Sequence, residues 1–195
     1  MTASVTLSPS AVYGTPGATL QVPINLTSQG TASPAMFQTD LSFDQTKLTF
    51  SSAQVAGQAT TAGKSLTTTL LANGNVRLLV TGLNQTVIAN GLVAYATFTL
   101  NQQFLIGSTP LALMNCTSSS ALGMSLSTGC TAGAVTAFTC DINGDGAVNV
   151  VDVQLIVNEA LGVAPPVNDL NHDGAVNVAD VQIVINAALG LGCVY

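Results

Sequence analysis

The sequence predicts a mainly β protein, in which a β-sandwich is followed by a small helical domain. Residues 1–139 consist of short segments of alternating apolar and polar residues, separated by turn residues. Residues 141–190 contain a sequence unit that occurs twice at a fixed offset, which is the signature of an internal repeat. Each copy of the unit ends in an apolar stretch with helical spacing. We therefore expect two domains, at residues 1–139 and 140–195.

The first domain is expected to form many short strands. The apolar residues of 20–27 all fall on one face of an extended chain, and Asn73-Gly74 is a strong hairpin signal. The expected strands are 4–8, 20–27, 36–43, 48–51, 66–72, 76–81, 93–100, 111–114 and 134–138. Short strands at this spacing are typical of a sandwich of two sheets.

Each copy of the repeat opens with a twelve-residue loop that is rich in side-chain oxygens. An EF-hand loop binds Ca²⁺ through positions 1, 3, 5, 7, 9 and 12, with a backbone carbonyl at position 7 and glycine at position 6. The residues at the six ligand positions are Asp141, Asn143, Asp145, Ala147, Asn149 and Asp152 in the first copy, and Asp169, Asn171, Asp173, Ala175, Asn177 and Asp180 in the second. The sequence thus predicts two Ca²⁺ ions, although Asp replaces the usual Glu at position 12.

A short helix is expected after each loop. Apolar residues recur at i, i+3, i+4 and i+7 from Val153 and from Val181. Gly162 and Gly190 supply the stop signals. No helical pattern precedes the first loop, so each copy is expected to be a loop followed by a helix rather than a complete helix–loop–helix.

The scarcity of charge excludes some partners. Charged residues make up 6% of the chain, and six of the nine acids are the aspartates of the two loops. The rest of the chain has no basic patch, so we expect no nucleic-acid partner. No apolar run approaches the length of a membrane span. A surface with so little charge is unusual for a free monomer, which predicts that neighbours cover part of it.

Four cysteines, Cys116, Cys130, Cys140 and Cys193, indicate an oxidising compartment. They allow three pairings. Proximity in the sequence favours Cys116–Cys130, and the two-fold repeat favours Cys140–Cys193 because it should bring the ends of the tail together; four reduced thiols are the alternative. Loops with three carboxylates each suit the calcium concentration outside cells. We expect a secreted protein whose targeting segment has been removed.

No catalytic residue is expected. The one histidine, His172, stands at loop position 4, where its side chain should point away from the ion into solvent. Glycoside hydrolysis needs two suitably placed carboxylates, and the first domain has only Asp40 and Asp44. Sugar binding has weak support, because tryptophan is absent and Tyr13 and Tyr95 are more simply explained as core or edge residues.

The tail resembles a type I dockerin, a calcium-folded module that plugs into cohesin domains in cellulosomes. The resemblance covers residues 141–190 and rests on the two loops. It implies that the loop positions named above coordinate calcium. In that family, partner choice is read largely at loop positions 10 and 11. Here these are the apolar residues Val150, Val151, Val178 and Ala179, so partner contact is expected there but the family's hydroxyl-based specificity does not carry over.

Residues 1–139 resemble a cohesin domain or a related carbohydrate-binding sandwich. The resemblance rests on a turn at 16–19 that leads into a strand at 22–26, on the segments 37–44 and 47–50, and on the strand at 92–100. Another immunoglobulin-like or jelly-roll sandwich is the alternative. The last strand runs almost directly into Asp141, whereas a dockerin that searches for partners is usually tethered flexibly.

Two functions therefore remain open. The favoured one is a non-catalytic, extracellular or cell-surface assembly protein of prokaryotic type. In it, the dockerin-like tail of one chain docks on the cohesin-like sandwich of the next, and a head-to-tail contact that does not close forms a filament. The other is a carbohydrate-binding or adhesion module that a dockerin attaches to a scaffold. The expected partner is a second copy of the chain or another cohesin- or dockerin-bearing protein.

Overall fold

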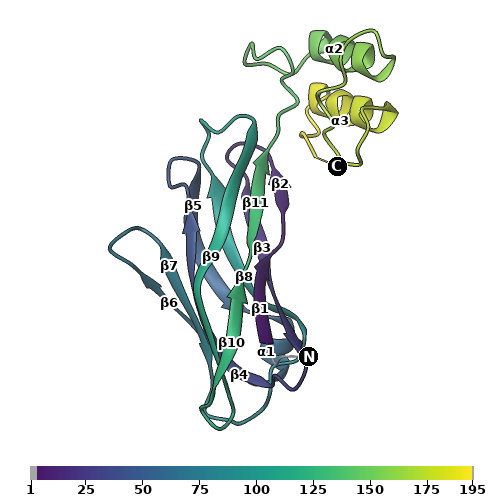
Figure 1. The fold of residues 1–195 in the computed structure, drawn as a ribbon. Helices are drawn as coiled ribbons and strands as arrows, with labels where there is room; N and C mark the ends of the chain where they lie inside the picture. The colour runs from purple at the N-terminus through teal and green to yellow at the C-terminus, as the bar shows by residue number, and fades with distance from the viewer. Residues whose placement is uncertain (1–3, 195) are drawn as a thin grey trace. The chain divides into compact units, whose positions relative to one another are not determined.

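The computed structural model describes residues 4–194 and confirms the expected class, a β-sandwich followed by a small helical region (Figure 1). Its elements are β1 (Ser4–Pro9), β2 (Val12–Gly14), β3 (Thr19–Gln29), β4 (Pro34–Phe43), β5 (Leu48–Val55), α1 (Gly57–Thr61), β6 (Ser65–Leu70), β7 (Val76–Thr81), β8 (Gly91–Leu100), β9 (Gly107–Ser120), β10 (Ser125–Cys130), β11 (Ala132–Ala137), α2 (Val150–Ala160) and α3 (Val178–Ala188).

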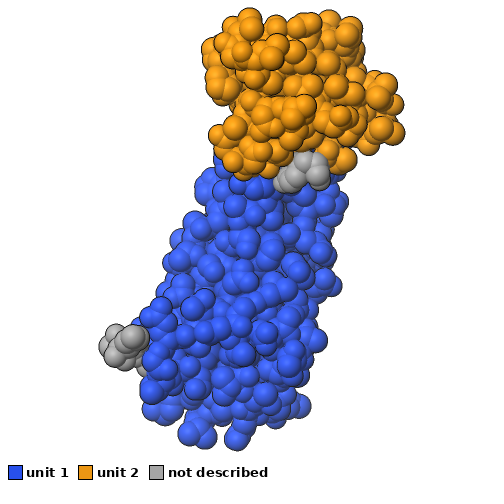
Figure 2. Space-filling view, turned by 90° about the vertical axis from the view of Figure 1, so that its right-hand side faces the viewer, with its two compact units in different colours: residues 1–137 blue, residues 138–195 orange. Residues whose placement is uncertain are grey.

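The chain divides into two compact units, residues 1–137 and residues 138–195 (Figure 2). The division falls two residues before the expected boundary at 139. Phe138 and Cys140 account for the difference, because both are buried in the apolar core of the second unit together with Ile156 and Val184. The two units are described separately below.

The strands of the first unit form two layers. One layer has the order β5-β8-β3-β1 and the other has the order β10-β9-β4-β7-β6. The layers are joined on one side, because β1 pairs in parallel with β10 through residues Ser4–Leu7. On the other side, β5 and β6 are edge strands that pair only with β8 and β7 respectively. The sandwich is therefore closed along one seam and open along the other.

Alternation along the strands builds the core of the sandwich. In β3, Val22, Ile24 and Leu26 are fully buried while their neighbours face outward. Burying one such side chain contributes roughly 1.5–3 kcal/mol. Phe98 of β8 lies at the centre of an aromatic cluster, with the rings of Phe43 and Phe50 edge-on to it at centroid distances of 5.0 and 5.6 Å. The pattern that predicts the strands is thus the pattern that fills the core.

All nine expected strands are present, but some elements were not predicted. The structure adds β2, β10 and the short helix α1, and it extends β9 as far as Ser120. The segment after Cys116 is rich in serine and glycine, and its composition gives no strand signal. It is extended because β9 and β10 pair with each other and with β4 and β1, so tertiary pairing outweighs intrinsic propensity there.

The second unit is built on two equivalent helices, α2 and α3. Asn149 and Asn177 are their N-cap residues, and each forms a capping box with the aspartate three residues later. The helices pack through Ile156, Ile183 and Val184. A disulfide joins Cys140, before the first loop, to Cys193, after the second helix. The ends of the repeat region are therefore held together, as the two-fold repeat suggests.

Candidate metal loops and binding faces

Both loops of the second unit are wrapped around the aspartate at position 1. Asp141 accepts the N–H groups of Gly144 and Gly146 at 2.8 and 2.9 Å. Asp169 accepts the N–H group of Gly174 at 2.9 Å in the second loop. The glycine at position 6 has a φ of 91° in the first loop and 97° in the second. Only glycine adopts this backbone without strain, so the sharp turn explains its place in both copies.

The other predicted ligands are drawn toward one another inside each loop. The amide of Asn143 lies 2.8 Å from a carboxylate oxygen of Asp145. In the second loop, the amide of Asn177 lies 3.1 Å from Asp173 and 3.2 Å from the carbonyl oxygen of Ala175. If the side-chain amide of Asn143 or Asn177 were turned by 180°, its oxygen would take the place of its nitrogen and would lie close to the other oxygens of the loop. Carboxylate, amide and carbonyl oxygens are the ligands that calcium prefers, so these residues fit that ion.

No three carboxylate, imidazole or thiol side chains converge at one point among residues 4–194. The aspartate at position 12 of each loop is held by backbone groups. Asp152 is fully buried and accepts the N–H groups of Ile142, Asn143 and Asn149, the last of these in the capping box. Asp180 has the same three contacts in the second copy. The sequence assigned these aspartates only to the metal, whereas the Asn-x-x-Asp spacing also indicates a cap.

The contacts of Asp152 leave it a reduced capacity for metal. A carboxylate has about four acceptor sites, and backbone N–H groups already occupy most of those of Asp152. Burial raises the pKa of Asp152, but the N–H groups of Asn149, Asn143 and Ile142 outweigh burial and hold that pKa below its ordinary value. The carboxylate is therefore charged at neutral pH.

His172 differs from its expected position. The ring was expected to be a solvated side chain, but it is half-buried and lies edge-on to the ring of Phe138, with centroids 5.9 Å apart. Its backbone has a φ of 58°, a left-handed conformation that His adopts more readily than most residues. His172 therefore belongs to the packing of the second unit, and it holds the second loop against the start of that unit.

The helix starts expose the residues that the resemblance indicates as partner contacts. Val150, Val151 and Val178 are 76%, 49% and 78% exposed, and Ala179 is also exposed. These residues occupy the first turn of α2 and of α3, directly after the loops. Further exposed apolar residues of this unit are Leu161, Val163, Val167, Leu189, Leu191 and Val194. The unit thus presents apolar side chains in two nearly equivalent sets.

In the sandwich, the outer face of β9-β4-β7-β6 carries a cluster of hydrogen-bonded polar side chains. Arg77 donates from Nε and Nη2 to the two carboxylate oxygens of Asp40, at 2.6 and 2.8 Å. The amide of Asn115 donates to the same carboxylate at 2.9 Å. The hydrogen bond from Arg77 is the main reason why the pKa of Asp40 is lowered. No local pattern in the sequence predicts this pairing, because Asp40 and Arg77 lie on different strands.

Apolar side chains surround this ion pair on the same face. Met114 of β9 stands opposite Asp40, and Leu79 of β7 stands opposite Gln38. Met114 is exposed and Leu79 is half-buried. Methionine and arginine are enriched at the centres of protein interfaces, where other charges are depleted. The outer face of the other layer carries mainly serine and threonine from β1, β5 and β8.

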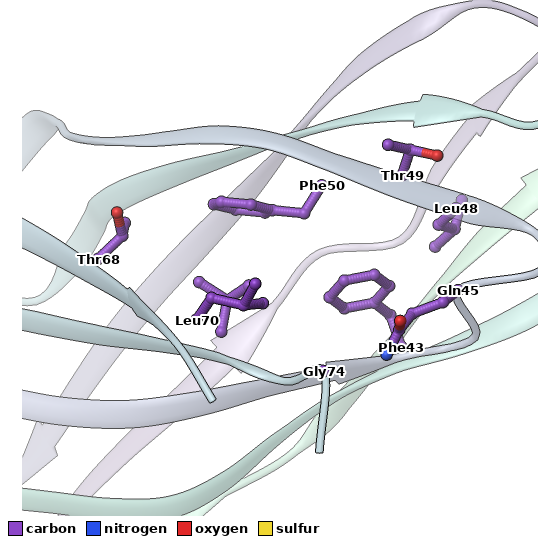
Figure 3. A pocket seen from close by; sticks show the side chains of 9 residues that line it. Phe43, Gln45, Leu48, Thr49, Phe50, Thr68, Leu70 and Gly74 are labelled. Carbon is purple, nitrogen blue, oxygen red and sulfur yellow. The ribbon is translucent and has the colours of Figure 1, made fainter. Parts of the chain in front are cut away.

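A cleft opens between the edge strands β5 and β6 (Figure 3). Its volume is about 360 Å³, and no charged residue lines it. Phe43, Phe50 and Leu70 lie around the open space, while Gln45 and Thr68 add polar groups. The open seam of the sandwich is therefore apolar with a neutral polar rim.

Comparison with known proteins decides the family. A family model for the cohesin domain matches residues 5–137. The chain belongs to the cohesin family. A second family model, for the type I dockerin domain, matches residues 139–189. Cohesin and dockerin domains are non-catalytic modules that bind each other, and type I dockerins bind calcium, so the chain is a cellulosome-type protein–protein docking module. No curated protein matches it.

Solved cohesins share the fold of the first unit. A cohesin from Clostridium acetobutylicum has a TM-score of 0.59 at 20% identity, over 69% of this chain and 91% of that one. The sixth cohesin of scaffoldin B from Acetivibrio cellulolyticus, solved with a dockerin, has a TM-score of 0.60 at 19% identity, over 69% and 99%. A non-cellulosomal cohesin from Archaeoglobus fulgidus gives 0.57 at 14%, over 72% and 95%. None of the described helices could cross a membrane.

Proposed function

We propose that this chain is a calcium-dependent, non-catalytic assembly protein in which the dockerin of one copy docks on the cohesin domain of the next. The observation that carries the proposal is the presence of both complementary modules in one chain. We further propose that assembly takes place outside the cell, where calcium is abundant and disulfides persist. Both disulfides expected from the sequence are present, Cys116–Cys130 and Cys140–Cys193.

The short connection between the modules favours docking on another copy. Only residues 138–140 separate the end of β11 from the first loop. Three extended residues span at most about 10 Å. A connection this short contains no flexible linker, which we propose disfavours docking of the dockerin on the cohesin domain of its own chain. Contact between the dockerin of one copy and the cohesin domain of the next repeats from copy to copy without closing, which generates a filament.

The outer face of β9-β4-β7-β6 is our proposed docking face. It combines a bidentate ion pair that is already formed with the apolar side chains of Met114 and Leu79. Arg77 is 38% exposed at its side chain, so its remaining N–H groups are available to a partner. Val150 and Val151, or Val178 and Ala179 in the second copy of the repeat, would contact the apolar part of this face.

We propose two Ca²⁺ ions, one in each loop. The residues that would hold them are Asp141, Asn143, Asp145, Ala147, Asn149 and Asp152 in the first loop and Asp169, Asn171, Asp173, Ala175, Asn177 and Asp180 in the second, with the two alanines contributing carbonyl oxygens. Each loop carries three negative charges and no lysine or arginine. Calcium would neutralise this repulsion and would fix the start of each helix, so binding contributes directly to folding.

The proposal is tested with a full-length variant in which Val150, Val151, Val178 and Ala179 are all replaced by Asp. Acidic residues in the first turn of a helix are favourable, so the helices should remain folded. In sedimentation velocity with calcium, wild type should form long assemblies and the variant should be monomeric. Val167→Asp, at a valine of similar exposure between the repeats, is the control that should assemble. A quadruple variant that assembles like wild type would refute the proposal.

The cleft between β5 and β6 favours a second candidate function, the binding of a neutral sugar. Its lining combines the rings of Phe43 and Phe50 with the amide of Gln45, and it holds no charge. One or two pyranose rings suit a pocket of about 360 Å³. In an NMR titration, cellobiose should shift signals of Gln45 and Thr68 in wild type but not in Phe50→Ala. If cyclohexanol shifts the same signals as strongly as cellobiose does, or if cellobiose shifts none of them, sugar recognition is excluded.

A further inference from the structure

Strand β9 contains a β-bulge on the proposed docking face. Gln38 of β4 pairs with Thr117, and Asp40 pairs with Met114, so Thr39 stands opposite two residues, Asn115 and Cys116. Asn115 has a φ of 51°, a left-handed conformation that is uncommon outside glycine. Bulges of this kind redirect one side chain and are found next to functional sites. Here the redirected side chain is that of Asn115.

The redirected amide completes the set of donors on Asp40. Asp40 is only 2% exposed, so its carboxylate depends on protein donors rather than water. Arg77 supplies two of these donors, and Asn115 supplies the third, at 2.9 Å. Without Asn115, the Asp40 carboxylate and the Arg77 guanidinium could rotate together relative to the sheet. The two hydrogen bonds between them fix each group relative to the other, but they do not fix the orientation of the pair.

The disulfide Cys116–Cys130 holds the bulge in place. β10 pairs with β9 at Ser118 and Ser119 and then leaves it to pair with β1. The next backbone hydrogen bond on that side joins Leu113 to Thr131. Between these points, the disulfide is the covalent link from β9 to β10, and the Cys116 N–H also donates to Cys130 Sγ at 3.2 Å. The buried Thr39 supports the bulge from below, with its hydroxyl 3.2 Å from the carbonyl oxygen of Met114 and 3.2 Å from Cys116 Sγ.

We propose that Asn115 is a positioning residue of the docking face, and that the Cys116–Cys130 disulfide sets the bulge that places its amide on Asp40. This inference rests on the proposed function, since it assigns a role within the same face. It gives the disulfide a purpose beyond stability: it keeps the Asp40–Arg77 pair in one orientation before the partner arrives. A face that is already ordered binds more tightly, because less freedom is lost on docking.

Three full-length variants separate positioning from simple stability. Asn115→Gly removes the amide but keeps the left-handed backbone, which glycine adopts freely. Asn115→Asp keeps the shape but places a second carboxylate beside Asp40. Cys116→Ser/Cys130→Ser removes the link to β10. Asn90→Gly is the control, because Asn90 is an exposed asparagine that bonds to Ser28 of β3, on the other layer.

Each variant is measured by its self-association constant in sedimentation and by the NMR signal of Arg77 Nε–H. Asn115→Gly and the double serine variant should associate about tenfold more weakly, which corresponds to about 1.4 kcal/mol. Asn115→Asp should be weaker still. In all three variants the Arg77 Nε–H signal should shift and exchange faster with water, while Asn90→Gly should match wild type in both measurements.

Two results would overturn the inference. One is an Arg77 Nε–H signal that stays unchanged in both Asn115→Gly and the double serine variant, because the bulge would then not position the pair. The other is a changed signal with an unchanged association constant, because the pair would then not matter for docking. If wild type itself never associates, the proposed function fails, and with it the role in docking. The Arg77 signal in the variants still decides whether the bulge places the carboxylate.

Discussion

Replacing Arg77 by leucine should leave the Asp40 carboxylate buried with Asn115 as its remaining donor. The Asp40 side chain is 3% exposed, while that of Arg77 is 38% exposed. Removing one partner of a fully buried pair costs about 3–5 kcal/mol, and the exposure of Arg77 reduces this, so we expect a loss of about 2–3 kcal/mol in the free energy of unfolding. Asp40→Asn/Arg77→Leu should lose only about 1 kcal/mol, because no charge is then left unpaired.

The assay is urea denaturation of the full chain in calcium, with fluorescence of the sandwich tyrosines Tyr13 and Tyr95 as the probe. Acid gives an internal check. Pairing with Arg77 lowers the pKa of Asp40 in the folded state. The stabilisation is therefore complete above the unfolded pKa of about 3.9 and is lost as the pH falls through the lower folded pKa. The deficit of Arg77→Leu should shrink below about pH 4. A deficit under about 0.5 kcal/mol at pH 7 would refute the reasoning.

Three further predictions concern the dockerin. Chelation with EGTA should unfold α2 and α3, seen as a loss of helical circular dichroism, while the strand signal remains; helices that are equally stable in chelator would contradict the metal assignment. Asp145→Asn and Asp173→Asn should each remove one of the two Ca²⁺ ions in calorimetry, whereas Asp44→Asn, in a turn of the sandwich, should leave both. Cys140→Ser/Cys193→Ser should destabilise the second unit by about 4 kcal/mol in the loop-entropy model, measured by thermal unfolding in calcium.

The sequence predicts the fold well where its signals are local. Alternation located β3 and β7, and the loop ligands and helix spacing located the repeat, because each of these patterns is complete within a few residues. Pairings between distant strands carry no such signal. β10 has a composition typical of a loop, and it becomes a strand only because β1 and β9 are available to pair with it.

The candidate sites show the same difference between local patterns, which the sequence predicts, and contacts between distant strands, which it does not. The two disulfides follow from sequence proximity and from repeat symmetry. The Asn-x-x-Asp spacing indicates that Asp152 caps its helix in addition to standing at ligand position 12. The ion pair of Asp40 and Arg77 could not be found from the sequence, because it depends on the register between β4 and β7. The same is true of the bulge at Asn115, which exists only in relation to β4.

Head-to-tail docking, the central claim, is tested most directly by mixing two defective chains. One chain carries Asp at positions 150, 151, 178 and 179 and so lacks a working dockerin. The other carries Leu79→Arg and Met114→Arg and so lacks a working docking face. In calcium, each chain alone should sediment as a monomer, and the mixture should form a 1:1 heterodimer and nothing larger, because only one pair of intact surfaces remains. A mixture that stays monomeric, or either chain assembling alone, would contradict the claim.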